Sequence, residues 1–367
     1  MNSFGRIFRI SLFGASHAPL LGVDIEGCPA GIALGREVFE PDLARRRGGT
    51  PGTTSRTECD IPFIERGCQK GYTTGEALSI FFENRNIRRE DYSVFRTQPR
   101  PGHADWVALQ KYGNACDRSG GGIFSGRMTL PLVAAGVVAK RLLQREYPQI
   151  QLSAGLLEVG GRSVLASAIQ ERAAGDGLGE VIKEAKAADE WGEVNRRGQA
   201  IRDRLGRLIK EAKAAGDSLG GVIGCRVAGV PVGLGEPFFD SVESCISHLA
   251  FSIPGIKGIE FGAGFASARM CGSEHNDCYM DAQGHTATNH AGGISGGVTN
   301  GNELIFRVAV KPTPSISRAQ ETFDFALNQM APLSIKGRHD TCFALRLSVV
   351  IEAITAIVLA DFSLINK

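Results

Sequence analysis

Three of the seven histidines stand in polar, glycine-flanked segments unlike a hydrophobic core. They are His17 in GASHA, His103 in RPGHADW and His339 in GRHD. A free imidazole has a pKa of about 6.5, so it can donate or accept a proton at neutral pH. We therefore treat these three as candidates for proton transfer. The alternative is that each histidine simply hydrogen-bonds a loop backbone.

Arginines form the second group of side chains with chemical potential. They are Arg45, Arg46, Arg47, Arg56, Arg100, Arg127 and Arg338. Planar guanidinium groups match phosphate and carboxylate groups, so a site that gathers several of them would bind a small polyanion. Charge runs of this kind also occur simply as solvated surface.

Glycine-rich segments indicate several tight loops near a ligand. The chain has 47 glycines, which cluster in GGGIFSG, GDSLGG, GLGEP and AGGISGG. The loop from Gly120 to Gly126 precedes an apolar stretch, and a loop that leads into a helix N-terminus is a natural anion site. The segment KPTPS at 311–315 offers an ammonium group, hydroxyls and backbone amides. The alternative for KPTPS is a plain proline-rich turn.

Hydrophobic patterning predicts the elements that position these groups. Alternation predicts strands at 8–12, 23–25, 222–227 and 306–310, and places GASHAPLLG between the first two. Apolar stretches at 130–143 and 349–360 predict buried helices. Residues 36–59 are polar and arginine-rich, and predict a mobile surface loop, RRRGGTPGTTSR.

A strongly charged section covers residues 168–216. Apolar residues recur at helical spacing from Ile201 to Ala212, which predicts an amphipathic helix peripheral to the chemistry. The piece at 173–188 is similar to 214–224, but one short copy does not define a repeat. Strands and helices mix without a regular βαβ rhythm, so we predict an α+β fold. We find no linker and expect one domain, 1–367.

Composition narrows the classes of function. Lys and Arg number 41 and Asp and Glu 39, giving a net charge of +2, too balanced for a protein whose main partner is a nucleic acid. Nine cysteines without a CxxC pair, and no apolar leader, favour a reduced, cytoplasmic setting. The apolar stretch at 349–360 is broken by Glu352 and is too short to cross a membrane.

Other common sites fit the sequence poorly. Cys271, His275, Cys278 and His285 do not have the spacing of a standard zinc finger or ribbon, so we expect no metal. The chain has no GxxxxGK[ST] motif, and its glycine clusters do not follow a strand as GxGxxG does. The sequence therefore disfavours both a P-loop site and an ordinary dinucleotide fold.

Taken in order, the motifs resemble those of chorismate synthases across nearly the whole chain. They are FGASHA, DIEGCPAGI, LARRRGG, YTTGEAL, RPGHADW, KYG, SGGGIFSGR, GDSLGG, GLGEPFFD, SIPGIKGIEFGAGF, NHAGGISGG, VAVKPTPSI and GRHDTC. Only the charged section at about 168–212 lies outside the match. The resemblance implies helices sandwiched between antiparallel sheets, a homotetramer and reduced FMN (FMNH2) as cofactor. The implied reaction is a 1,4-anti elimination of phosphate from 5-enolpyruvylshikimate-3-phosphate to give chorismate.

The same resemblance assigns roles to residues. It implies that His17 protonates the departing phosphate, that His103 gives a proton to the flavin N1 region, and that Asp340 orients the flavin N5. It implies substrate binding by Ser16, Arg46, Arg47, Arg127 and Arg338. It implies FMN contacts from Ser125, Gly126, Arg127, Gly255, Gly296, Lys311, Pro312, Thr313, Ser315 and Arg338.

The chain departs from the family pattern at several of these motifs. GASHA stands where the family commonly has GESHG, which removes an acidic neighbour of His17, and Gly52 stands where an arginine is customary. A homologue that binds flavin or an anion without catalysis is therefore an alternative. A second alternative is an oxidoreductase that uses a nicotinamide cofactor. For a synthase, NADPH would serve only as an indirect reductant, with an external flavin reductase as a possible partner.

Overall fold

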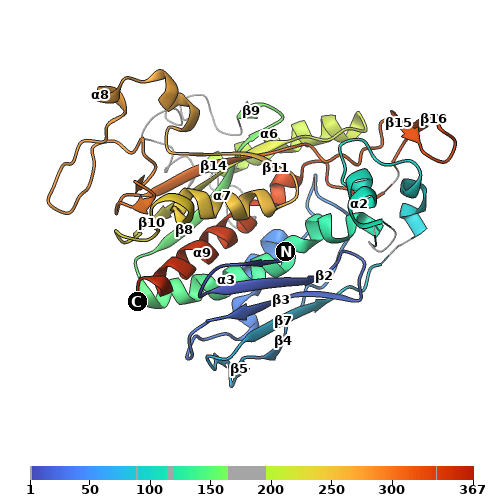
Figure 1. The fold of residues 1–367 in the computed structure, drawn as a ribbon. Coiled ribbons are helices and arrows are strands. Elements are labelled where there is room, and N and C mark those ends of the chain that lie inside the picture. The colour runs from blue at the N-terminus through green and yellow to red at the C-terminus, as the bar shows by residue number, and fades with distance from the viewer. Residues whose placement is uncertain (1, 88–89, 114–116, 118, 164–195, 336) are drawn as a thin grey trace.

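Two helices separate two antiparallel sheets at the centre of the protein (Figure 1). A computed structural model describes residues 2–87, 90–113, 117, 119–163, 196–335 and 337–367. The helices are α3 (Thr129–Glu146) and α9 (Ser348–Ile365), and nearly every residue of α9 is buried. Helix α3 packs on the first sheet, and α9 packs on the second. The predicted α+β architecture, with helices sandwiched between antiparallel sheets, is confirmed.

The first sheet holds the N-terminal part of the chain. Its strand order is β1 (Ser3–Phe4), β2 (Arg9–Gly14), β3 (Leu20–Glu26), β7 (Leu78–Glu83) and β4 (Phe63–Arg66). The register pairs Ile10 with Ile25 and Val23 with Ile80, so alternating apolar residues share the face against α3. The turn between β2 and β3 carries His17, as the alternation predicted.

The second sheet covers the other side of the helices. Its order is β11 (Ile256–Phe261), β14 (Leu304–Val310), β10 (Gly221–Ala228), β8 (Gln151–Val159) and β9 (Arg162–Ser163). The strands predicted at 222–227 and 306–310 correspond to β10 and β14. Strand β14 leads directly into the KPTPS segment, which places Lys311 at the end of the sheet.

The crossing of α3 and α9 is unusually close. A Cβ atom at Gly136 would lie 2.3 Å from the Cβ of Ala353, so only glycine fits there. Beside this crossing, Glu352 of α9 accepts hydrogen bonds from Lys140 and Arg45, both at 2.8 Å. Among the described residues, α9 is the one helix long and apolar enough to span a bilayer, and most of it lies inside the core.

Smaller elements surround this core. The remaining helices are α1 (Glu40–Arg46), α2 (Asp105–Tyr112), α6 (Arg196–Ala214), α7 (Val242–Ser252) and α8 (Gly272–His275). Three hairpins pair β5 (Cys68–Gln69) with β6 (Tyr72–Thr73), β12 (Ile294–Ser295) with β13 (Val298–Thr299), and β15 (Gln320–Asp324) with β16 (Gln329–Leu333).

Two expectations for the polar segments need comment. The prediction of a surface loop across 36–59 is wrong in part, because α1 forms there, buries Leu43 against the core and ends on Arg46. The helix predicted at 201–212 is confirmed as the C-terminal part of α6. The rest of the charged section up to 195, with the short repeat at 173–188, lies outside the described residues.

Helix α6 is closer to the candidate site than its charge suggested. Its buried Ile209 packs on Gly52, where a Cβ atom would lie 2.8 Å from the isoleucine side chain. Just beyond the helix, Ser218 donates a hydrogen bond to the carbonyl of Thr313 at 2.7 Å. The helix therefore supports two loops that also border the cavity described below.

Candidate active site

Loops from both halves of the fold line one cavity of about 660 Å³. Most of the residues predicted for catalysis and binding face it. These are Ser16, His17, Arg46, Arg47, His103, Ser125, Gly126, Arg127, Gly255, Lys311, Pro312, Thr313, Ser315, Arg338 and Asp340. Gly296 is not among the lining residues, because it lies in the turn between β12 and β13. Residues as far apart in the sequence as Ser16 and Asp340 thus meet at one site.

The glycine loop at 120–122 separates two of the candidate histidines. Gly120, Gly121 and Gly122 all have positive φ angles, of 60°, 92° and 55°. A Cβ atom at Gly120 would lie 2.1 Å from Cε1 of His17, and one at Gly121 would lie 3.5 Å from Nε2 of His103. Glycine is therefore required at 120 for two reasons, backbone conformation and the space that His17 occupies.

His17 is almost completely buried, at 2% exposed. Its Nδ1 lies 3.1 Å from the hydroxyl of Ser16, and its ring packs edge-on against Tyr92 with the centroids 5.1 Å apart. Arg56 donates weakly to the same hydroxyl at 3.4 Å. The backbone carbonyl of Ala15 accepts a hydrogen bond from the side chain of Asn84. Ser16 and Tyr92 thus fix the orientation of the imidazole.

His103 belongs to a buried ionic group with Arg100 and Asp105. Nδ1 of His103 lies 2.8 Å from Asp105 Oδ1, and Arg100 donates to the same carboxylate at 2.7 and 2.8 Å. Burial tends to raise the pKa of Asp105, but the hydrogen bonds from Arg100 outweigh it and hold that pKa far below its usual range. Burial lowers the pKa of His103 despite the favourable carboxylate. His103 is therefore neutral at pH 7 in the unliganded protein.

The RHD segment contacts the loop that follows α1. Asp340 accepts hydrogen bonds from the backbone N–H of Thr54 and from Arg346, both at 2.8 Å. Arg338 donates to the side-chain oxygen of Asn86 at 3.0 Å. His339 sits among these groups, and burial lowers its pKa to about 4, helped by the nearby charge of Arg100. His339 is thus uncharged at neutral pH.

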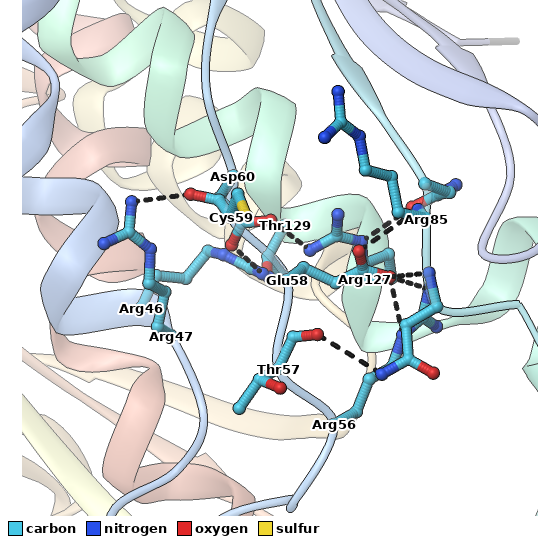
Figure 2. Close-up of polar contacts among 12 residues, drawn as sticks. Arg46, Arg47, Arg56, Thr57, Glu58, Cys59, Asp60, Arg85, Arg127 and Thr129 are labelled. Carbon is cyan, nitrogen blue, oxygen red and sulfur yellow. Dashed lines mark hydrogen bonds and ion pairs between the residues drawn. The ribbon is translucent and has the colours of Figure 1, made fainter.

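A cluster of guanidinium groups lies around one buried carboxylate (Figure 2). Asp60 accepts from Arg127 at 2.5 Å and from Arg46 at 3.2 Å, and all three side chains are less than a tenth exposed. Arg47 is held differently, by Glu40 at 2.7 Å and by the carbonyl of Cys59 at 2.9 Å. The cavity therefore has a strongly cationic region built from α1, the 56–60 segment and the start of α3.

The opposite loops offer donors for a second anionic group. Lys311 donates to the carbonyl of Gly102 at 2.5 Å, and burial, aided by Lys257, lowers its pKa. The hydroxyl of Thr313 is buried and has no hydrogen-bond partner among the described residues. The ring of Phe343 lies against Gly126, where a Cβ atom would come within 2.7 Å. An aromatic face beside a lysine and an unpaired hydroxyl fits a flat cofactor that carries a phosphate.

Proteins of one family are similar to this chain over almost its whole length. The sequence profile of the chorismate synthase family matches residues 8–364. A chorismate synthase of Chitinophaga pinensis is 52% identical over all of this chain and 98% of its own length. The chain belongs to the chorismate synthase family. A chorismate synthase of Korarchaeum cryptofilum is 41% identical over 98% of this chain and 96% of its own.

A solved structure extends the likeness to the fold. A crystal structure of chorismate synthase superposes with a TM-score of 0.74 at 26% identity, covering 99% of this chain and 93% of that one. Family membership brings with it a requirement for reduced flavin in general. The buried Thr313 hydroxyl and the Phe343 ring leave room in the cavity for contacts with such a group.

Sequence reasoning overlooked several lining residues. Asp60 and Glu58 went unnoticed because lone carboxylates in a polar segment are usually surface groups, although their position within an arginine-rich stretch was a usable signal. Tyr92 and Phe343 have no motif that marks them as cavity residues. Arg346 lies on the η8 turn (Phe343–Arg346), where only the fold brings it onto Asp340.

Proposed function

We propose that this protein is a chorismate synthase that eliminates phosphate from 5-enolpyruvylshikimate-3-phosphate. The observation that carries the proposal is the meeting of His17, His103, Arg127, Arg338 and Lys311 in one cavity of a chain from this family. In the reaction a ring C–H bond and the C–O bond to phosphate both break, and a new C=C bond forms. The substrate bears two carboxylates and a phosphate, so it needs several cations and a proton donor.

The arginines would bind the charged groups of the substrate. Arg46 and Arg127 are held rigidly by Asp60, and Arg338 by Asn86, so their positions do not depend on the substrate. A preorganised charge stabilises the leaving phosphate without further reorganisation. His17, held by Ser16 in the buried turn after β2, would donate a proton to the phosphate as it departs.

We propose FMN, in its reduced form, as the flavin. When bound, the reduced flavin lends an electron transiently and recovers it, so the reaction has no net redox change. Ser125, Gly126, Arg127, Gly255, Lys311, Pro312, Thr313, Ser315 and Arg338 would hold it. His103 would lie close to it, and its neutral imidazole would gain proton affinity from an adjacent negative charge. Asp340, fixed by Thr54 and Arg346, would orient it.

An anaerobic assay tests the function directly. Purified protein with dithionite-reduced FMN should convert the enolpyruvyl substrate to chorismate, measured by the rise in chorismate absorbance, while the flavin ends in its reduced state. Flavin binding without turnover would favour the non-catalytic homologue. Stoichiometric consumption of NADPH per product would favour the oxidoreductase. Omitting dithionite and supplying NADPH, with and without a separate flavin reductase, shows whether the protein depends on an external reductant.

We further propose a homotetramer that works in the cytoplasm on this small-molecule substrate. The support for the assembly is family membership, and the support for a small-molecule substrate is family membership together with a nearly balanced net charge of +2. Size-exclusion chromatography with light scattering would give the assembly state, and a monomer of 39.1 kDa would contradict the proposal.

A further inference from the structure

The segment from Arg56 to Asp60 carries two carboxylates that organise the arginines beside it (Figure 2). Glu58 accepts from Arg56 at 2.7 Å and from the backbone N–H groups of Arg85 and Asn86 at 3.2 Å. Asp60 lies deeper and accepts from Arg46 and Arg127, which come from α1 and from the η5 turn (Gly126–Met128). Asp60 therefore links α1 and the η5 turn, which are distant in sequence.

Asp60 has a backbone conformation that non-glycine residues seldom adopt. Its φ angle is 48°, in the left-handed region, which aspartate tolerates better than most side chains. Conformations of this kind persist where the surrounding contacts fix them, and they concentrate at functional sites. Here the fixing contacts are the two guanidinium groups.

Among the residues that the structure describes, the arginines on Asp60 each keep one buried nitrogen without a protein partner. Within the described part of the chain, Nε of Arg46 and Nη2 of Arg127 have no hydrogen-bond acceptor, although both side chains are buried. The other donors are used: Arg46 bonds Thr129, and Arg127 bonds Asn84. Two positive groups and one negative group leave one net positive charge, so the trio fits an oxyanion of the substrate.

We propose that Asp60 is a positioning residue, which holds Arg46 and Arg127 so that their unused N–H groups bind an oxyanion of the substrate. This inference rests on the proposed function for the identity of the substrate. Asp60 is itself an anion that would repel an oxyanion, and each of its oxygens already accepts from an arginine, so we assign it no direct contact with the substrate. Its effect is exerted through the geometry of the pair and through their charge.

Binding to the flavin-free protein tests the proposal without any turnover. Asp60→Asn keeps the size of the side chain and removes its charge, and it should weaken binding of 5-enolpyruvylshikimate-3-phosphate about 30-fold by calorimetry. The binding of inorganic phosphate, titrated in parallel, should also become weaker. The matched control is Asp361→Asn, which removes another buried carboxylate, one that accepts from the backbone at Ile7 and Phe8 far from the cavity. It should leave both affinities unchanged.

A double-mutant cycle separates positioning from a loss of fold. Asp60→Asn leaves two buried cations uncompensated, so it also lowers stability. Arg46→Met removes one of those cations and should restore folding in the double variant. Because part of the effect of Asp60 passes through Arg46 and the rest through Arg127, the double variant should lose less affinity than the product of the two single losses. Losses that simply multiply, or an Asp60→Asn protein that binds as wild type does, would overturn the inference.

The pH profile gives a readout that a purely structural role would not change. Arg46 faces Asp60, Arg127, Arg346 and Thr129, and burial lowers its pKa to about 9 while Asp60 opposes the fall. Without Asp60, Arg46 should lose its proton at lower pH, so the substrate affinity of Asp60→Asn should begin to decline at a lower pH than that of wild type. Parallel profiles would contradict the inference. Turnover by wild type decides the proposed function separately.

Discussion

Two groups of cations and proton carriers share the cavity but are stabilised in opposite ways. The guanidinium groups of Arg46, Arg56 and Arg127 are paired with the carboxylates of Asp60 and Glu58. The imidazole cluster of His17, His103 and His339 lies on glycine loops, and burial keeps His103 and His339 neutral. We therefore propose that one cluster binds the charged groups of the substrate and that the other exchanges protons.

Removing a proton donor should have the largest effect on this division. His17→Ala should lower turnover by about 10²- to 10⁴-fold, because general acid catalysis contributes rate enhancements of that size. FMN affinity, measured by flavin fluorescence, should stay near the wild-type value, because the imidazole of His17 contacts Ser16 and Tyr92 and is not among the predicted FMN contacts. Equal turnover in the variant would remove His17 from the chemistry and leave the site to the arginines alone.

The glycine loop offers a way to displace the imidazole without deleting it. Gly120→Ala adds a methyl group 2.1 Å from the His17 ring and should lower turnover by about tenfold or more, together with stability. The control is Gly71→Ala, in the turn between β5 and β6, whose φ of 78° imposes similar backbone strain with nothing within 4 Å of the added atom. It should lose only the stability that the strain costs, and no turnover. Equal losses of turnover in the two variants would contradict a role for the contact between Gly120 and His17.

Acid should act on the imidazole cluster through stability. The pKa of His339 is about 4 in the folded state and about 6.5 when unfolded, so below pH 6.5 the unfolded chain binds a proton that the folded protein refuses. Wild type should therefore lose up to about 3 kcal/mol through this group as pH falls from 6.5 to 4. His339→Gln should remove that share of the loss in urea titrations at the two pH values. The control is His248→Gln at an exposed position, which should leave the loss of stability unchanged.

Much of the architecture follows from local patterns. Alternation at 8–12, 23–25 and 306–310 gave the strands, because each has one buried face, and the apolar stretches gave α3 and α9. Helix α1 was harder, because only Leu43 and Arg46 are buried in it and its arginines suggested a solvated loop. These two residues are buried by parts of the chain that are distant in sequence, and local composition does not reveal such contacts.

The candidate site divides in the same manner. His17, His103 and Lys311 stand in distinctive motifs, so the sequence alone marked them as candidate site residues. The role of Asp60 depends on Arg127, 67 residues away, and the role of Gly120 depends on His17, 103 residues away. Such contacts between residues distant in the sequence can be identified only from the fold.

The close crossing of α3 and α9 lies between the parts of the fold that carry His17 and Lys311. His17 belongs to a turn of the first sheet, and Lys311 to the end of the second, and the helix pair packs between the two sheets. A methyl group at Gly136 would clash with Ala353, so we expect Gly136→Ala to move the two sheets, and with them His17 and Lys311, further apart. Gly136 does not line the cavity, so such an effect would reach the site through the packing of the core alone.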